Sequence, residues 1–255
     1  MKIEIEDIDS CRRRMEISAE AEEIALDLED VTEEFAKTSR VPGFRPGKAP
    51  LKLVERRYGT EIVREAEDRI VERLCRVAAQ ERGLKLAAVI EFSDVTIDRK
   101  TGASFSVVVD ALPDFELPDY RKIPLIKDRT DETGLKDEIS AFLLEKTSFD
   151  PPRSLVELEL AQSEEEGEGE EEEAEKKAKE RVRLMIMLRK IAELEGIEVD
   201  DNDLDSRIKS MAGEHHLTPA QLRADLEEKG SLQRLSAFLL AEKTLDFILG
   251  ANPRT

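Results

Sequence analysis

The chain has 255 residues, of which 59 are acidic and 40 are basic, so its formal net charge at pH 7 is −19. Nucleic acids and anionic membranes repel such a chain on average, and any contact with RNA therefore requires a local basic patch. No stretch approaches the roughly 18 apolar residues of a membrane span, and residues 1–10 lack the basic and apolar parts of a signal peptide, so we expect a cytoplasmic protein that does not bind membranes.

The first part of the sequence predicts a small α+β domain over residues 1–115. Alternating apolar and polar residues indicate four strands. These strands cover residues 2–6, 12–18, 89–97 and 103–111. Apolar residues at helical spacing predict three helices between the two pairs of strands. These helices cover residues 18–37, 51–58 and 60–82.

A linker and an all-helical domain are predicted to follow. Pro113, Pro118 and Pro124 favour an extended linker over residues 116–130, because proline ends regular structure. No strand pattern follows this segment, so residues 131–255 are expected to form an elongated all-α domain. Its predicted helices cover residues 131–146, 181–194, 201–211, 218–228 and 231–249, with another beginning at Ser154. The predicted fold class is therefore α+β.

Two stretches of the helical part invite functional interpretations. Residues 163–179 form an acidic insert dominated by Glu, which is typical of a solvated tract or helix face. On the helix over residues 181–194, Val182, Met185 and Ile186 add apolar surface to a second flank. A helix that is apolar on two sides is either sandwiched between others or partly exposed for binding, so these three residues are candidate substrate-binding residues.

The densest basic stretch lies in and after the loop between the first two helices. Phe44 is a large apolar group on this loop, and Arg45 and Lys48 flank it. Arg40, Lys52, Arg56 and Arg57 surround these three residues. A basic loop with an exposed aromatic suits a mixed target, with phosphates for the cations and an apolar pocket or base face for Phe44. In the alternative, Phe44 folds back onto the domain and the cations only solubilise it.

The loop also carries a family resemblance. Residues 43–50 read Gly-Phe-Arg-Pro-Gly-Lys-Ala-Pro, which resembles the trigger factor signature Gly-Phe-Arg-x-Gly-Lys-x-Pro at every specified position. The similarity includes the strands and helices around the loop and extends to about residue 126. It resumes in three later segments, over residues 145–157, 188–200 and 242–249.

The resemblance implies an ATP-independent chaperone that docks at the ribosomal exit tunnel, against a ribosomal protein and rRNA, and shields nascent polypeptides. It implies no cofactor, and a homodimer off the ribosome is a further candidate assembly. The motif match assigns ribosome contact to Gly43, Phe44, Arg45, Gly47 and Lys48. Arg40, Lys52, Arg56 and Arg57 would form a supporting basic patch.

Two departures from the family pattern limit what the resemblance implies. Family members usually carry an FKBP-like prolyl isomerase domain of about 80 to 100 residues between the linker and the helical arms. Here only residues 127–146 lie between the matching segments, so we expect no isomerase activity and no enzyme. Residues 163–179 replace a longer helical hairpin, which predicts a smaller cradle for clients.

Three functions remain under consideration from the sequence alone. The first is the ribosome-docked chaperone, and the second is a prolyl isomerase, against which the missing domain argues. The third is an off-ribosome chaperone or assembly scaffold whose acidic tract recruits basic clients. No catalytic set of nucleophile, base and orienting group can be assembled. No metal site is expected either, because His215 and His216 point about 100° apart on a helix and lack a third ligand.

Overall fold

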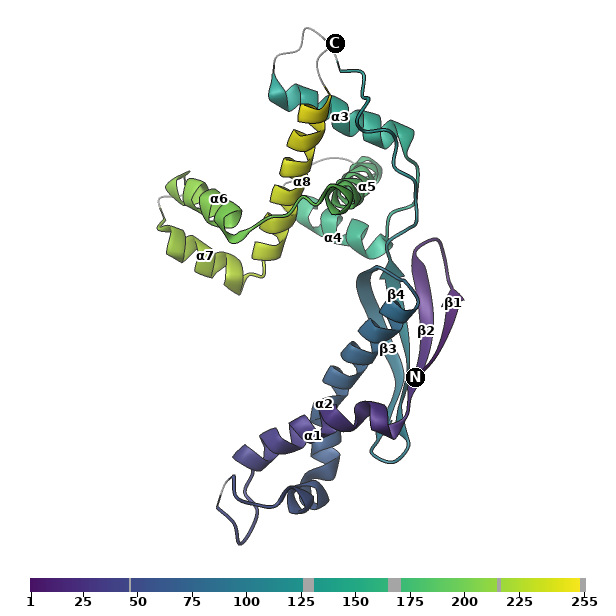
Figure 1. Cartoon of the computed structure of the whole chain (residues 1–255), viewed down its shortest axis with the longest axis vertical. Coiled ribbons are helices and arrows are strands. Elements are labelled where there is room, and N and C mark those ends of the chain that lie inside the picture. Colours follow the sequence, from purple (N-terminus) through teal and green to yellow (C-terminus); the bar gives the residue numbers. More distant parts are fainter. Residues whose placement is uncertain (46, 126–130, 165–170, 215–216, 253–255) are drawn as a thin grey trace. The chain divides into compact units, whose positions relative to one another are not determined.

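The computed structural model describes residues 1–45, 47–125, 131–164, 171–214 and 217–252 (Figure 1). The chain divides into two compact units, which are described separately. Unit 1 comprises residues 1–113 and 152–158, and unit 2 comprises residues 114–151 and 159–255. Unit 1 combines a sheet with helices, whereas the described part of unit 2 contains only helices, which confirms the α+β fold class.

Unit 1 is built on a four-stranded antiparallel sheet in the order β1-β2-β4-β3. The strands are β1 (Lys2–Asp7), β2 (Arg12–Ala19), β3 (Leu86–Asp98) and β4 (Gly102–Ala111). Met15 and Ile17 of β2 pair with Val107 and Phe105 of β4, and all four side chains are buried. They share one face because successive side chains of a strand point to opposite faces of the sheet.

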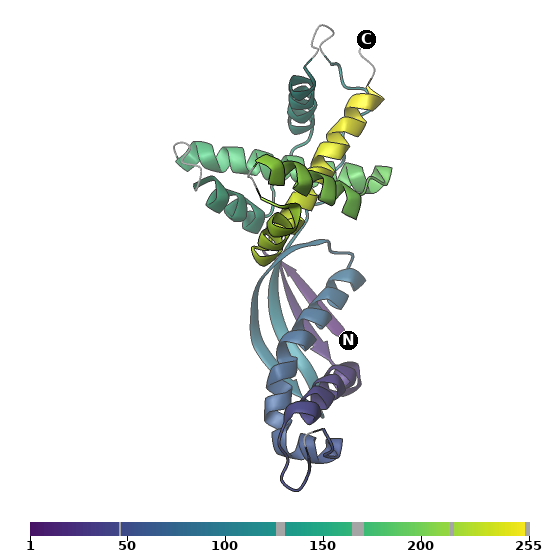
Figure 2. The same cartoon turned by 90° about the vertical axis from the view of Figure 1, so that its left-hand side faces the viewer.

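Two helices cover that apolar face, as Figure 2 shows. They are α1 (Ala21–Thr38) and α2 (Leu51–Glu81). Glu20 and Glu23 cap α1 reciprocally, so the helix begins at Ala21. Residue 18, where the sequence predicts the helix to begin, lies within β2. The two predicted helices over residues 51–82 run on as a single helix with a kink, at which Tyr58 has non-helical angles of φ −119° and ψ 21°.

Residues 152–158 belong to unit 1, which corrects the predicted boundary at residue 131. They include the first turns of α4 (Arg153–Glu164). The Asp110 carboxylate, only 1% exposed, accepts hydrogen bonds from Arg12 Nε at 2.8 Å and from the backbone N of Ser154 at 3.0 Å. A carboxylate from β4 thus accepts the backbone N–H of Ser154, in the first turn of this helix, where N–H groups lack partners within the helix.

Unit 2 contains the remaining helices and has its own apolar core. Besides the later part of α4, they are α3 (Glu132–Lys146), α5 (Glu171–Glu195), α6 (Asp201–Glu214), α7 (Pro219–Glu228) and α8 (Leu232–Ala251). The core joins Ile139 and Leu143 of α3, Met187 and Ile191 of α5 and Ile248 of α8, all fully buried. Within the described residues, no helix is long and apolar enough to cross a membrane.

The predicted linker over residues 116–130 is wrong for its described part. Residues 114–125 belong to unit 2, where Ile123 is buried and Leu117 and Leu125 pack against the core. Asn252, after α8, fixes this segment because its Oδ1 accepts from Ile123 N at 2.7 Å and its Nδ2 donates to the Tyr120 carbonyl at 2.8 Å. The apolar residues between the prolines explain the packing, and residues 126–130 lie outside the described part.

One pair of stacked rings and two cation–π contacts connect the segment over residues 114–125 to α5. The rings of Phe115 and Phe149 stack with centroids 4.4 Å apart. Lys190 Nζ lies 4.2 Å from the Phe115 centroid, and the Arg183 guanidinium lies 5.7 Å from the Phe149 centroid. Two cationic side chains of α5 therefore form cation–π contacts with two aromatic residues from two other segments.

The candidate substrate-binding residues on α5 are not all accessible. Val182 is 4% exposed and Ile186 is 7% exposed, so their assignment as an open binding surface is wrong. Met185 is 43% exposed and remains available. Over residues 181–195 most side chains of α5 are buried or half-buried, so this part of the helix is sandwiched, which is one of the two alternatives that the sequence leaves open. Of the acidic insert, residues 163–164 end α4 and residues 171–179 begin α5, while residues 165–170 lie outside the described part.

Candidate functional site

The signature loop lies at the tip of the α1–α2 hairpin (Figures 1 and 2). Gly43 and Gly47 have φ angles of 85° and 76°, which glycine adopts without the steric cost that other residues incur. Gly47 N donates to the Ala36 carbonyl at 3.1 Å, and Lys48 N donates to the Arg45 carbonyl at 3.0 Å. The loop is therefore a defined turn fastened to the last turns of α1.

The kink in α2 supports the loop from below. Tyr58 donates its hydroxyl to the Arg40 carbonyl at 2.8 Å, and its ring packs against Phe35 with centroids 6.2 Å apart. Val41, in the connection between the two helices, and Val54 of α2 are both buried in the core of unit 1. A regular helix would carry the Tyr58 ring elsewhere, so the non-helical residue 58 belongs to the machinery that positions the loop.

Phe44 does not fold back into the core, because 42% of it is exposed. Leu51 and Leu53, at the start of α2, are 42% and 39% exposed and add apolar surface that the sequence analysis missed. The signal that could have found them is their place on the helix, where they flank the position of buried Val54.

The cations around Phe44 are all exposed or half-buried, and none forms an ion pair with a described carboxylate. We call this surface the docking patch, which consists of Arg40, Phe44, Arg45, Lys48, Lys52, Arg56 and Arg57. Elsewhere on the same two helices arginines are paired, as in Arg69 with Glu34 at 2.9 Å. In a chain of net charge −19, the patch therefore concentrates uncompensated positive charge.

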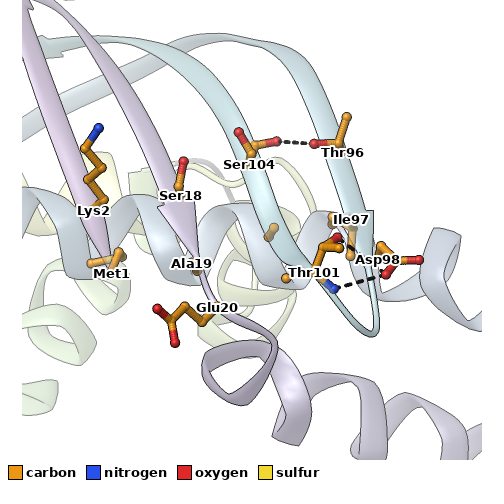
Figure 3. Close-up of a pocket in the computed structure, with 12 residues that line it drawn as sticks. Met1, Lys2, Ser18, Ala19, Glu20, Thr96, Ile97, Asp98, Thr101 and Ser104 are labelled. Carbon is orange, nitrogen blue, oxygen red and sulfur yellow. Dashed lines mark hydrogen bonds between the residues drawn. The ribbon is translucent and has the colours of Figure 1, made fainter.

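A second feature of unit 1 is an open hollow of about 560 Å³ at the end of the sheet (Figure 3). Its lining comes from the ends of the strands and is about equally polar and apolar. Hydroxyl groups of Ser and Thr alternate there with apolar side chains, and the charged lining residues are Lys2, Glu20 and Asp98. The Asp98 carboxylate accepts from the backbone N of Lys100 at 2.8 Å and of Thr101 at 3.1 Å, so it shapes the β3–β4 turn. The lining lacks a histidine or cysteine, and it offers no pairing of nucleophile and base.

Other candidate chemistry is equally sparse in the described part of the chain. No group of three His, Cys, Asp or Glu side chains gathers there as a metal site would require, and His215 and His216 lie outside the described residues. Cys11 and Cys75 are both buried and share no disulfide bond. Burial raises the pKa of both thiols, which makes them poor nucleophiles.

Comparison with known families gives two matches along the chain. The family model described as bacterial trigger factor protein matches residues 1–140, and the model for the C-terminus of the same protein matches residues 159–250. Only residues 141–158 lie between the two matches. In the structure these residues are the end of α3, a short connection and the start of α4.

Individual relatives agree with the family match. The trigger factor of Opitutus terrae is 32% identical over 49% of this chain and 28% of its own length, and that of Thermomicrobium roseum is 40% identical over 48% and 25%. The match thus spans about a quarter of these relatives.

A solved structure titled "Promiscuous Substrate Recognition in Folding and Assembly Activities of the Trigger Factor Chaperone" superposes with a TM-score of 0.53 at 13% identity. It covers 98% of this chain and 99% of that one, which shows a shared fold. Because the N-terminal family model alone covers more than half of the residues, the chain belongs to the trigger factor family.

Proposed function

We propose that this protein is an ATP-independent cytoplasmic chaperone that docks on the large ribosomal subunit through the docking patch, shields nascent polypeptides and has no prolyl isomerase activity. The observation that carries the proposal is the exposed Phe44 among cations without ion-pair partners in the described structure. Ribosomal RNA offers phosphates for the cations, and a ribosomal protein offers an apolar pocket for the ring.

The geometry of the patch supports different roles for Phe44 and for the cations of α2. Phe44 lies on a turn whose two glycines and backbone hydrogen bonds fix it, so little ordering cost opposes its insertion into a partner. The cations of α2 lie on long side chains that can follow a phosphate backbone. Binding that depends on such contacts weakens steeply with salt.

Client binding requires separate apolar surface, and unit 2 offers it in scattered positions. Met185, Leu194, Leu217 and Phe238 are 43%, 66%, 44% and 52% exposed. Single exposed apolar groups suit weak and reversible binding of unfolded segments, since each one contributes only a small contact. Of the three substrate-binding residues that the sequence suggests, Met185 alone keeps this role.

The docking proposal predicts that replacing Phe44, Arg45 and Lys48 together by Ala lowers ribosome affinity at least about 100-fold, because one anchor and two phosphate contacts are lost. Co-sedimentation with ribosomes at moderate salt measures the effect. A matched control replaces Leu26, Arg64 and Arg76 by Ala, which removes one exposed apolar group and two cations outside the patch.

The control should pellet with ribosomes as the unaltered chain does. Equal loss in both triple variants would show that net charge governs binding, and the patch would lose its role. If the unaltered chain does not pellet at all, the off-ribosome scaffold becomes the better interpretation.

The chain should also fail to accelerate prolyl isomerisation. Residues 141–158, between the two family matches, form parts of two helices and leave no room for an isomerase domain. We expect a proline-containing peptide to isomerise at its uncatalysed rate, over tens to hundreds of seconds at 25 °C. A protease-coupled peptide assay, with an active isomerase as positive control, measures this, and turnover that scales with protein concentration would refute the expectation.

A further inference from the structure

Arg99 lies outside the docking patch in sequence but reaches the helices that carry it. Its Nη1 is 3.2 Å from Glu55 Oε1 on α2, and its Nη2 donates to the Thr32 hydroxyl on α1 at 2.9 Å. Thr32 is 1% exposed and donates in turn to the Leu28 carbonyl. One guanidinium from the β3–β4 turn thus contacts both helices of the hairpin.

The β3–β4 turn holds Arg99 in this position. Asp98 accepts two backbone hydrogen bonds within the turn, and Gly102 closes it with a φ of 98°. An ideal Cβ on Gly102 would lie 2.0 Å from the Ala19 carbonyl oxygen, so the turn is seated tightly against the end of β2. Arg99 therefore projects from a rigid support, which suits a positioning residue.

The partner of Arg99 is the one acidic residue within the basic stretch. Glu55 is the only acid between Lys37 and Arg57, and it lies three positions after Lys52 on α2. Residues three or four apart on a helix are neighbours, so a free Glu55 carboxylate would be within reach of Lys52. It would then compete with any phosphate for that cation.

We propose that Arg99 keeps the docking patch purely cationic by sequestering Glu55, and so sets the affinity of the patch for a polyanionic partner. This inference rests on the proposed ribosome docking. Arg99 is a positioning residue, because it acts through Glu55 and need not touch the partner. Its guanidinium pairs with the carboxylate from the β3–β4 turn. The exposed side chains of Lys52, Arg56 and Arg57 then stay available to the partner.

The test compares Arg99→Gln, Glu55→Gln and the double variant in ribosome co-sedimentation at several salt concentrations. We expect Arg99→Gln to weaken binding about 3- to 10-fold, with a shallower salt dependence, because the freed carboxylate occupies part of the patch. Glu55→Gln should bind at least as tightly as the unaltered chain. The double variant should regain that affinity, since it has no carboxylate to sequester.

Arg73→Gln is the matched control. It breaks a different arginine–carboxylate pair, which joins α2 to α1 and in which Arg73 Nε lies 2.9 Å from Asp27 Oδ1, and it removes the same charge. It should leave ribosome binding unchanged. If Arg99→Gln and the double variant are equally weak, or if Arg99→Gln binds like the control, Arg99 is only a structural tie and the inference is wrong.

Salt elution from immobilised heparin separates this inference from the docking proposal. Heparin is a polyanion and offers none of the apolar contacts of a ribosomal protein, so its binding tests only the charge of the patch. Earlier elution of Arg99→Gln with recovery in the double variant supports the inference even if ribosomes do not bind. A chain that binds neither heparin nor ribosomes overturns both proposals.

Discussion

Replacing Asp110 by Asn is expected to lower the free energy of unfolding of unit 1 by about 3 kcal/mol. Asp110 is 1% exposed, and its carboxylate accepts from Arg12 Nε at 2.8 Å, Arg12 Nη2 at 3.2 Å and Ser154 N at 3.0 Å. The amide keeps the shape of the side chain but removes the charge, so the Arg12 guanidinium, with 23% of its side chain exposed, loses its partner. The start of α4 also loses the anion that faces its N–H groups.

The same variant should change how stability depends on pH. Burial of Asp110 disfavours its charged form, but the hydrogen bonds from Arg12 and Ser154 outweigh burial and hold its pKa below the usual value of 3.8. A lowered pKa in the folded state means that the stabilisation is complete above the unfolded pKa and is lost as pH falls through the folded pKa. The difference in free energy of unfolding between the unaltered chain and Asp110→Asn should therefore be constant near pH 7 and should shrink below about pH 4.

Hydrogen exchange of the β2 and β4 amides is the appropriate measurement, because two units need not unfold in one transition. Asp68→Asn provides the control, since Asp68 is an exposed carboxylate on α2 and its loss makes the same change in net charge. It should cost less than about 0.5 kcal/mol. Similar protection in both variants would mean that the buried contact contributes little to the stability of unit 1.

The strands and helices are largely predictable because each has a clear period. Met15 and Ile17 alternate with exposed Arg14 and Glu16, and this alternation is what a half-covered sheet requires. The sequence pattern underestimates the length of β3 because its pairing with β4 contains three register shifts, which interrupt the alternation that defines a strand. Boundaries set by such irregularities depend on the neighbouring strand and leave no periodic signal.

The errors concern contacts between segments that are far apart in sequence. The prolines suggest a free linker, but Ile123 is fixed by Asn252, which lies beyond α8. Val182 and Ile186 are candidates for exposure because a helical wheel shows which residues are apolar but not how many neighbours surround the helix. The domain boundary differs for the same reason, since Ser154 joins unit 1 through a carboxylate on β4.

The docking patch likewise combines a part that is predictable from local sequence with a part that depends on distant segments. Its loop residues are identified from a contiguous motif, whereas the residue that neutralises Glu55 lies 44 positions away, in a turn whose sequence is ordinary. A long-range ion pair is decided by the placement of the turn, and that placement depends on Gly102.

Gly102→Ala is expected to lower the free energy of unfolding of unit 1 by about 3 kcal/mol or more, because it combines strain at positive φ with overpacking. The residue has a φ of 98°, and an added Cβ would lie 2.0 Å from Ala19 O and 2.8 Å from the carbonyl carbon of Glu20. Both obstacles are backbone atoms, which cannot rotate away as a flexible side chain would. The β3–β4 turn must therefore move away from the end of β2.

Gly83→Ala separates the two contributions to that cost. Gly83 also has a positive φ, of 68°, but nothing lies within 4 Å of its added Cβ, so this variant should lose only about 1 kcal/mol from backbone strain. Hydrogen exchange of the β3 and β4 amides gives both values. Equal losses in the two variants would show that the close approach at Gly102 relaxes at no cost.

The displaced turn should also affect the docking patch. Arg99 lies within the β3–β4 turn, so moving the turn draws its guanidinium away from Glu55 and Thr32. Folded Gly102→Ala protein should then bind ribosomes more weakly, and adding Glu55→Gln should restore affinity without restoring stability. Rescue of binding alone would show that the turn acts on the patch through the Glu55 charge, whereas loss of both together would mean that the turn supports the hairpin only by packing.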